Sequence, residues 1–378
     1  MVKNFHNKPF DDSTKLKLEI FGKCFREWFP VFIHNKYARR IYVFDFFAGR
    51  GMDSEGTFGS PLILLEEAKG EARKYCINAS KKVTFLFNES NKKNNSELRK
   101  NVSYYITGCQ KQNRCEKCVY DYEIKRSDFK KAFNAEETQE ILGNKDFGKF
   151  ILLDQYGFKE IDSDIFLKLV KSPKTDFIFF ISSSFIKRFQ KHEHTKKYID
   201  TEQLNFDESQ PKECHRIVAQ YFKSLIPKSQ EYYLHHFTIQ KENKGNYYGL
   251  IFGTNHTLGM EKFLKVCWKI DRLSGESNCN IDNDFEENTL FYNESSSHKK
   301  EKIEKAIETE ILNGNITDNV TGFKITIQKG CEPSLFTQIV KRLEEGSKVV
   351  RSGDVNNSSA NVHRVKKYTI KVCINEKK

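Results

Sequence analysis

The feature that most constrains this chain is a short apolar run that ends in a glycine-rich turn and leads to a well-marked helix start. The run RRIYVFDFF, at 39–47, is too short for a helix and has the composition of a strand buried on both faces. AGRG follows, and Ser60 and Pro61 then supply a favoured N-cap and a favoured first helical residue. Strand, glycine turn and helix in this order predict one unit of an α/β sheet.

Further apolar runs predict the rest of this sheet. Four more strands are expected, at 82–90, 119–124, 149–158 and 176–183. Helical patterns, including one at 14–32, lie around and between most of them, which implies crossover connections and a mainly parallel sheet. The runs YYLHHFTIQ and YYGLIFGTN flank ENKGN and predict a terminal antiparallel hairpin. This is the strand inventory of a Rossmann-type methyltransferase sheet.

The length of 378 residues suits one large and one small domain. We expect a Rossmann-type domain at 1–273, with a Cys-containing insertion near 104–122 and a charged helical insertion near 185–228. A polar linker at 274–298 follows. At 299–378, helices precede a basic hairpin, a pattern typical of a winged helix.

The net charge of +12 favours an anionic partner, and nucleic acid is the first candidate. The alternative is a solvated Lys-rich surface without a partner. No apolar run reaches the roughly 20 residues of a membrane span. Because 1–8 also lacks an apolar signal core, we expect a cytoplasmic protein without membrane contact.

The glycine turn is the first candidate binding site. Asp45 lies near the end of the predicted strand, and Ala48, Gly49 and Gly51 form the turn. Glycines allow the backbone to turn sharply and to approach a ligand closely at the carboxyl edge of a sheet. The pattern favours a nucleoside cofactor, and the alternative is a βα turn without a ligand.

Acidic residues also end the next two predicted strands. Glu89 can accept hydrogen bonds from both hydroxyls of a ribose, and Asp128 can accept one from the amine of adenine, with Phe129 against the ring. Each residue alone is also compatible with ordinary loop chemistry. Together with Asp45 they place acidic side chains at three successive strand ends.

The sequence DQYGF at the end of the fourth strand suggests a substrate site. A carboxylate such as Asp154 can hold the N–H groups of an exocyclic base amine, and Tyr156 can stack on a flipped base. The alternative is that Tyr156 is structural and Asp154 caps the following helix.

These segments resemble the three-Cys-motif partner (TcmP) family. The resemblance is carried by FDFFAGRGMDSEGTFGSPLILLEEA, by KLEIFGKCFREWFP before it and by YYGLIFGTNHTLGMEKF after it, and it spans most of 14–268. It implies a class I methyltransferase fold, S-adenosylmethionine as cofactor and a radical-SAM-like partner protein. Asp45, Gly49, Gly51 and the GSP turn at 59–61 are the matched positions. The family's fourth-strand motif usually reads D-P-F-G, similar to that of tRNA guanine-N2 methyltransferases, whereas this chain has D-Q-Y-G.

Three cysteines stand together in the polar segment GCQKQNRCEKC, which we expect to be a loop. Cys109, Cys115 and Cys118 have the spacing C-x5-C-x2-C, and the C-x2-C part suits zinc. A structural zinc site needs a fourth ligand, for which Cys76 or a distant His is available. The alternative is three reduced thiols, as expected in a cytosolic chain.

The C-terminal region carries the candidate nucleic-acid contacts. On a predicted helix at 334–345, apolar residues share one face and leave Lys341 and Arg342 outward, as in a groove-reading helix. Lys366 and Lys367 belong to the predicted hairpin. Many winged helices bind proteins instead.

Taken together, these features predict one of two functions. The chain is an S-adenosylmethionine-dependent N-methyltransferase acting on a nucleic-acid base, or a non-catalytic subunit that docks a partner enzyme or holds DNA or RNA.

Overall fold

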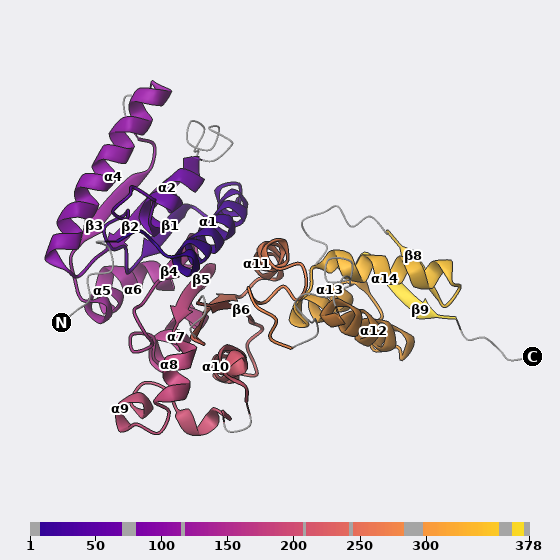
Figure 1. Cartoon of the computed structure of the whole chain (residues 1–378). Coiled ribbons are helices and arrows are strands. Elements are labelled where there is room, and N and C mark those ends of the chain that lie inside the picture. Colours follow the sequence, from indigo (N-terminus) through magenta and orange to yellow (C-terminus); the bar gives the residue numbers. More distant parts are fainter. Residues whose placement is uncertain are drawn as a thin grey trace, which may run out of the picture. The chain divides into compact units, whose positions relative to one another are not determined.

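The computed structural model describes residues 8–69, 81–114, 118–206, 209–241, 245–282, 298–354 and 365–373. The chain divides into two compact units, Met1–Asn255 and His256–Lys378, which are described separately (Figure 1). The division lies before the boundary expected at 273, because helix α11 (Thr257–Ile270) packs against α13 (Asn319–Gln328) of the second unit. Most of the expected linker lies outside the described residues.

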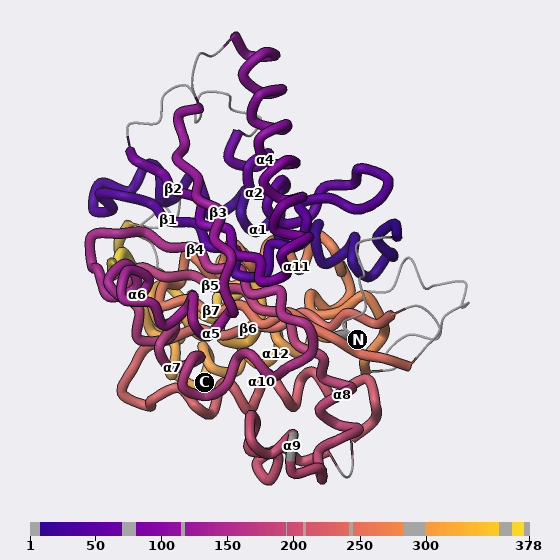
Figure 2. The backbone as a smooth tube through the Cα atoms, turned by 90° about the vertical axis from the view of Figure 1, so that its left-hand side faces the viewer, coloured from indigo at the N-terminus to yellow at the C-terminus, as the bar shows by residue number. Residues whose placement is uncertain are grey.

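The first unit is built on a seven-stranded sheet of order β3-β2-β1-β4-β5-β7-β6. Its strands are β1 (Arg40–Asp45), β2 (Lys82–Asn88), β3 (Asp121–Lys125), β4 (Phe147–Leu153), β5 (Thr175–Ile181), β6 (Tyr233–Gln240) and β7 (Tyr247–Thr254). The first five are parallel, and β7 is antiparallel to both β5 and β6. In Figure 2, β1, β4, β5, β7 and β6 follow one another down the picture. The expected α/β class, with a mainly parallel sheet and a terminal hairpin, is confirmed.

Helices cover both faces of this sheet. They are α1 (Asp12–Ile33), α2 (Ser60–Lys69), α4 (Lys92–Asn113), α5 (Phe129–Asn134), α6 (Glu136–Gly143), α7 (Ser163–Lys171), α8 (Ser183–Arg188), α9 (Glu193–Lys196) and α10 (Cys214–Ser224). On one face, Phe25 of α1 packs against Phe150 of β4, with ring centroids 5.3 Å apart. On the other face, Phe166 of α7 packs against Phe177 of β5 at 5.9 Å. Burial on both faces explains why the strands are almost continuously apolar.

Helix α4 corrects one expectation about the cysteine segment. Cys109 lies inside this 22-residue helix and not in a loop. Although the segment is polar overall, Leu98, Val102 and Ile106 recur at every fourth residue and form one buried stripe. The helix ends at Arg114, whose left-handed backbone (φ 53°) closes it.

The described part of the second unit contains α11, three further helices and a two-stranded antiparallel sheet. Besides α11 and α13, whose bounds are given above, its elements are α12 (His298–Leu312), α14 (Pro333–Glu345), β8 (Val349–Gly353) and β9 (Tyr368–Val372). Helix α13 was not expected, because Gly322 and two threonines weaken its helical pattern. The ring of Phe336 from α14 fills the place beside Gly322, where a Cβ atom would lie 2.1 Å from it. Close packing therefore explains this glycine.

Candidate cofactor and substrate site

The candidate site lies at the carboxyl edge of the sheet, where the strand order reverses between β1 and β4. Ligands of open α/β sheets bind in the crevice at such a reversal. Asp45 is the last residue of β1, Asp154 follows the last residue of β4, and Glu89 follows β2. All three therefore belong to one edge of the sheet, and the charges of Asp154 and Glu89 both contribute to raising the pKa of Asp45. The structure thus brings together three residues that the sequence identified separately.

Asp45 is a fully buried acid with an incomplete set of partners. Its Oδ1 accepts a hydrogen bond from the backbone N–H of Phe47 at 3.1 Å, and the hydroxyl of Ser60 also stabilises the carboxylate. Its Oδ2 is buried and has no hydrogen-bond partner among the described residues. Burial, before any other cause, raises the pKa of Asp45 from 3.8 to about 7. A buried acceptor of this kind is suited to a ligand that brings a donor.

The glycine turn beside Asp45 has a backbone that only glycine adopts readily. Gly49 and Gly51 have φ angles of +60° and +85°. The half-buried carboxylate of Glu89 accepts hydrogen bonds from the backbone N–H groups of Gly49 and Asn91. Burial is nevertheless the largest effect on Glu89 and raises its pKa. Glu89 is therefore fixed against the turn, and the neighbouring Ala48 is buried and donates its N–H to Asn88 O at 3.0 Å.

Two residues that the sequence analysis missed hold this arrangement. The side chain of Asn88, at the end of β2, donates to Phe46 O at 3.2 Å and Ser127 O at 3.0 Å, and so ties three strand ends together. Arg50, within the turn, donates from Nε to Asn94 Oδ1 of α4 and forms an ion pair with Glu97. In a sequence, an Asn at a strand end is a weak signal of a site. The spacing of residues also does not reveal the hydrogen-bond partners of Asn88 or of Arg50.

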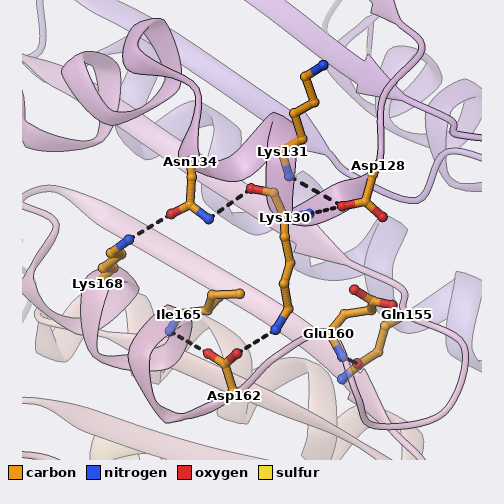
Figure 3. A network of polar contacts seen from close by, with 9 residues as sticks. All are labelled: Asp128, Lys130, Lys131, Asn134, Gln155, Glu160, Asp162, Ile165 and Lys168. Atoms are coloured by element: carbon orange, nitrogen blue, oxygen red, sulfur yellow. Dashed lines mark hydrogen bonds and ion pairs between the residues drawn. The ribbon is translucent and has the colours of Figure 1, made fainter. Parts of the chain in front are cut away.

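Asp128 and Phe129 lie at the start of α5 and have structural contacts. Asp128 caps this helix by accepting from the N–H groups of Lys130 and Lys131 at 3.0 and 3.4 Å (Figure 3). Phe129 is buried, and its ring packs on Phe47 at 4.9 Å between centroids. Contacts of this pair with adenine remain a prediction. Lys130 also joins α5 to α7 through a 2.7 Å ion pair with Asp162, which caps α7 (Figure 3).

Asp154 is held by Lys17, a residue of the first helix of the unit. Both of its carboxylate oxygens accept hydrogen bonds from Lys17 Nζ of α1, at 2.7 and 2.6 Å, and both side chains are mostly buried. Asp154 does not cap the following helix, because Asp162 has that role. The ammonium of Lys17 also lies 4.8 Å from the centre of the Phe180 ring. Sequence spacing gave no sign of Lys17, since it lies 137 positions from its partner.

The rest of the D-Q-Y-G segment divides between buried and exposed side chains. Gln155, which stands where the resembled family has Pro, is 1% exposed and donates to Phe180 O at 3.1 Å. It also accepts from the N–H of Glu160 at 3.0 Å (Figure 3). Tyr156 is 80% exposed, and Gly157 takes a φ of +91°. The buried glutamine thus fixes the loop, and the tyrosine ring is presented to solvent.

The candidate zinc ligands are only partly described. Cys115 and Cys76 lie outside the described residues, and the described part of the chain contains no group of three or more potential metal ligands. Cys109 Sγ accepts from the side chain of Asn113 at 3.4 Å. Cys109 and Cys118 both lie near Tyr105, whose pKa is raised by burial, by Glu66 and, to a smaller extent, by these two thiols.

The four basic residues expected to contact nucleic acid all have acidic partners. Arg342 pairs with Glu304 and Glu308 of α12 at 3.2 and 3.1 Å. The other three pairs are Lys341 with Glu345, Lys366 with Asp318 and Lys367 with Asp354. Such pairs near the surface contribute little stability, so another anion can replace the carboxylate.

A comparison with protein-family models gives no match, and no curated protein matches the chain in sequence. The chain is similar to the solved structure of Trm1 from Pyrococcus horikoshii with S-adenosyl-L-methionine, at a TM-score of 0.37 and 12% identity. That match covers 69% of this chain and 60% of Trm1, so the chain spans less than two thirds of it.

Two further solved structures are similar to the chain. Spermidine synthase from Thermotoga maritima has a TM-score of 0.32 and 11% identity, over 75% of this chain and 74% of that one. The O-methyltransferase TomG from Streptomyces achromogenes, solved with SAM, has a TM-score of 0.30 and 10% identity, over 67% and 98%. These likenesses are distant, and the strand order of the chain itself defines its fold. Among the described residues, no helix is both long and apolar enough to span a bilayer.

Proposed function

We propose that this protein binds S-adenosylmethionine at the Asp45–Glu89 edge of the sheet and methylates an exocyclic amine of a nucleic-acid base. The observation that carries the proposal is the buried Oδ2 of Asp45, which has no partner among the described residues, beside a glycine turn that Glu89 contacts. A ligand with several hydroxyl and amine donors fits this set of acceptors. The resemblance to the three-Cys-motif partner family favours the same cofactor.

Each acidic residue then has a distinct role. The cofactor, when bound, supplies an activated methyl group. The carboxylate of Glu89 would accept hydrogen bonds from ribose hydroxyls, and Gly49 and Gly51 would leave room for the backbone to approach the ligand. Asp45 lies deeper, and its burial makes any hydrogen bond it accepts stronger than one at the surface.

On the substrate side, Asp154 would accept an N–H of the amine and orient its nitrogen. The bidentate contact with Lys17 holds the Asp154 carboxylate in one orientation, and an aspartate oxygen has lone pairs left for a further donor. Tyr156 would stack on a base that has left its helix, which offsets part of the cost of unstacking. The helices and hairpin of the second unit, as a winged helix, would contact phosphates through Lys341, Arg342, Lys366 and Lys367.

A second candidate function is supported by one observation on the second unit. Val350, Val365 and Val372, on or next to its hairpin, are 55%, 51% and 36% exposed. Val350 is paired with Lys371 and Val372 with Val349, so these two valines lie on opposite faces of the hairpin, where each can contribute to a contact with a protein partner. In this alternative the chain is a non-catalytic subunit that docks a partner enzyme, such as the radical-SAM-like partner implied by the resemblance.

Calorimetric titration with S-adenosylmethionine tests the cofactor site. Glu89→Ala removes the proposed hydroxyl acceptors, and we expect affinity to fall by about 1–3 kcal/mol, or roughly 5- to 150-fold. Glu55→Ala is the control, because Glu55 is an exposed acid of the β1–α2 loop, which carries the glycine turn. Equal affinity of the Glu89→Ala variant and the wild type would exclude this placement of the cofactor.

Methyl transfer from labelled S-adenosylmethionine to single-stranded RNA or DNA tests the substrate side. Asp154→Asn keeps the size of the side chain but weakens the acceptor, and we expect transfer to fall by about a hundredfold or more. Cofactor affinity should stay close to that of the wild type. Transfer at the wild-type rate in this variant would contradict the role of Asp154. Cofactor binding without transfer to any nucleic acid would favour the docking subunit.

A further inference from the structure

A second surface of the first unit combines exposed aromatic rings with exposed basic side chains. It is formed by Phe185, Arg188, Phe189, Lys191 and Lys197, and is called here the α8–α9 platform. Phe185 and Phe189 are 41% and 38% exposed, although large apolar side chains are normally buried. Their ring centroids lie 4.5 Å apart, so the two rings form one continuous apolar surface.

Within the described part of the chain, no acidic side chain forms an ion pair with the cations of the platform. The segment 185–197 contains five Lys or Arg residues and one Glu. Among the described residues, Arg188, Lys191 and Lys197 are exposed and have no acidic partner, and Arg188 instead donates to the neutral side chain of Asn246 at 3.0 Å. By contrast, the four candidate cations of the second unit are all paired with carboxylates. The platform is therefore a site where positive charge exceeds negative charge among the described residues.

The platform is continuous with the segment that carries Asp154. Phe158, two residues after Tyr156, packs on Phe185 with ring centroids 5.5 Å apart. The N–H of Ser182, which precedes α8, donates to Gly157 O at 2.9 Å. Figures 1 and 2 both place α8 and α9 next to each other at one end of the first unit. Because α8 begins two residues after β5 and Asp154 directly follows β4, both belong to the carboxyl edge of the parallel strands, which is where a bound polymer would contact them.

We propose that the α8–α9 platform binds the single-stranded nucleic acid that flanks the target base. Bases stack on aromatic rings whatever their sequence, and nearby cations bind the phosphates, a combination typical of single-strand binding surfaces. A duplex hides the faces of its bases and cannot use the two phenylalanines in this way. This inference rests on the proposed function, since it takes the substrate to be a nucleic acid.

Fluorescence anisotropy with a labelled single-stranded RNA of about 20 nucleotides tests the platform, with the matching DNA strand and the RNA duplex as further probes. Phe189→Ala should weaken single-strand binding by roughly five- to fiftyfold. The triple variant R188E/K191E/K197E should weaken single-strand binding at least tenfold. It should also reduce the slope of log affinity against log salt concentration by about 2, because each of three lost phosphate contacts contributes about 0.7 to that slope. Comparison of the RNA and DNA strands identifies the preferred polymer.

Matched controls come from the opposite, amino edge of the sheet. Tyr37→Ala removes a ring that is 79% exposed, and K36E/R40E/K145E makes the same change of charge as the platform triple variant. Both should bind as the wild type does. Equal affinities of platform variants and wild type would overturn the proposal, as would equal losses in platform and control variants. Tighter binding of the platform to an acidic protein than to any nucleic acid would also overturn it.

Cofactor binding is measured on the same proteins, so the two proposals can fail separately. If platform variants lose RNA binding but the wild type does not bind S-adenosylmethionine, the platform stands and the proposed function fails. If the wild type binds the cofactor and transfers methyl groups while platform variants bind RNA normally, only the platform fails.

Discussion

Among single residues, Asp45 has the largest electrostatic conflict at the candidate site. Its side chain is fully buried, which raises its pKa from 3.8 to about 7. Because the folded-state pKa exceeds that of the unfolded chain, the folded state holds the proton more tightly. The contribution of this protonated carboxyl to the free energy of unfolding is fully present below pH 3.8 and is lost as the pH rises through about 7. At higher pH the protein therefore carries a buried charge that its own side chains do not fully compensate.

Asp45→Asn should remove this pH dependence. The amide keeps Oδ1 for the N–H of Phe47 but does not ionise. We expect the free energy of unfolding of the variant to exceed that of the wild type by about 1–4 kcal/mol above pH 7, and the difference to vanish near pH 4. Urea unfolding at a series of pH values measures this. A difference that does not change with pH would contradict the assigned pKa.

The positions at strand ends could be predicted where the signal is local, and the role of these residues in cofactor binding stays a prediction. Asp45, Gly49, Gly51 and Glu89 lie in or next to a strand end, and their neighbours in the sequence show this. The partner of Asp154 could not be predicted, because Lys17 reaches it across the fold from a helix 137 positions away. The ion pairs of Arg342 with α12 and of Lys366 with Asp318 could not be predicted for the same reason, whereas Lys341 and Glu345 are only four residues apart on α14.

At the level of elements, helix α4 and the segment after it form the least expected part of the first unit. The helix carries Cys109, and Cys118 lies close enough to influence Tyr105 on the same helix. The strands and the terminal hairpin were predicted correctly, because burial on both faces gives continuous apolar runs. The C-terminal part of α4 was expected to be a loop, since the helix buries only a narrow stripe, and α13 was not expected because it accommodates an interior glycine.

A zinc ion at Cys109, Cys115 and Cys118 remains a prediction for this element. The C-x2-C spacing motivates it, and zinc would join the end of α4 to the segment before β3. We expect about one equivalent of zinc by elemental analysis of protein purified without added metal. Cys109→Ser should lose the metal, whereas Cys331→Ser, a buried cysteine of the second unit, should retain it. Free alkylation of all three thiols in metal-free protein would refute the site.

On the scale of the whole molecule, the chain contains two separate buried cores. The first unit is centred on its sheet, and the second has its own cluster around Phe336, Ile339 and Tyr368. Each core also contains glycines that lie against a buried ring, of which Gly249 and Gly322 have the shortest contacts in their units. A Cβ atom at Gly249 of β7 would lie 1.9 Å from Nε2 of the buried His215, and one at Gly322 would meet Phe336.

These contacts predict that each unit can be destabilised on its own. Gly249→Ala should lower the melting temperature of the first unit, and Gly322→Ala that of the second, because overpacking costs about 1–3 kcal/mol. Calorimetric scans should show two transitions, and each variant should shift one of them.

His215 also contacts Ser183 and the carbonyl of Leu250, so the double variant Gly249→Ala/His215→Ala should lose less stability than the sum of the losses of the two single variants. Gly314→Ala, where added atoms meet nothing within 4 Å but φ is +76°, separates backbone strain from overpacking. If Gly322→Ala shifted both transitions equally, the two units would unfold together, which would contradict the prediction that each unfolds on its own.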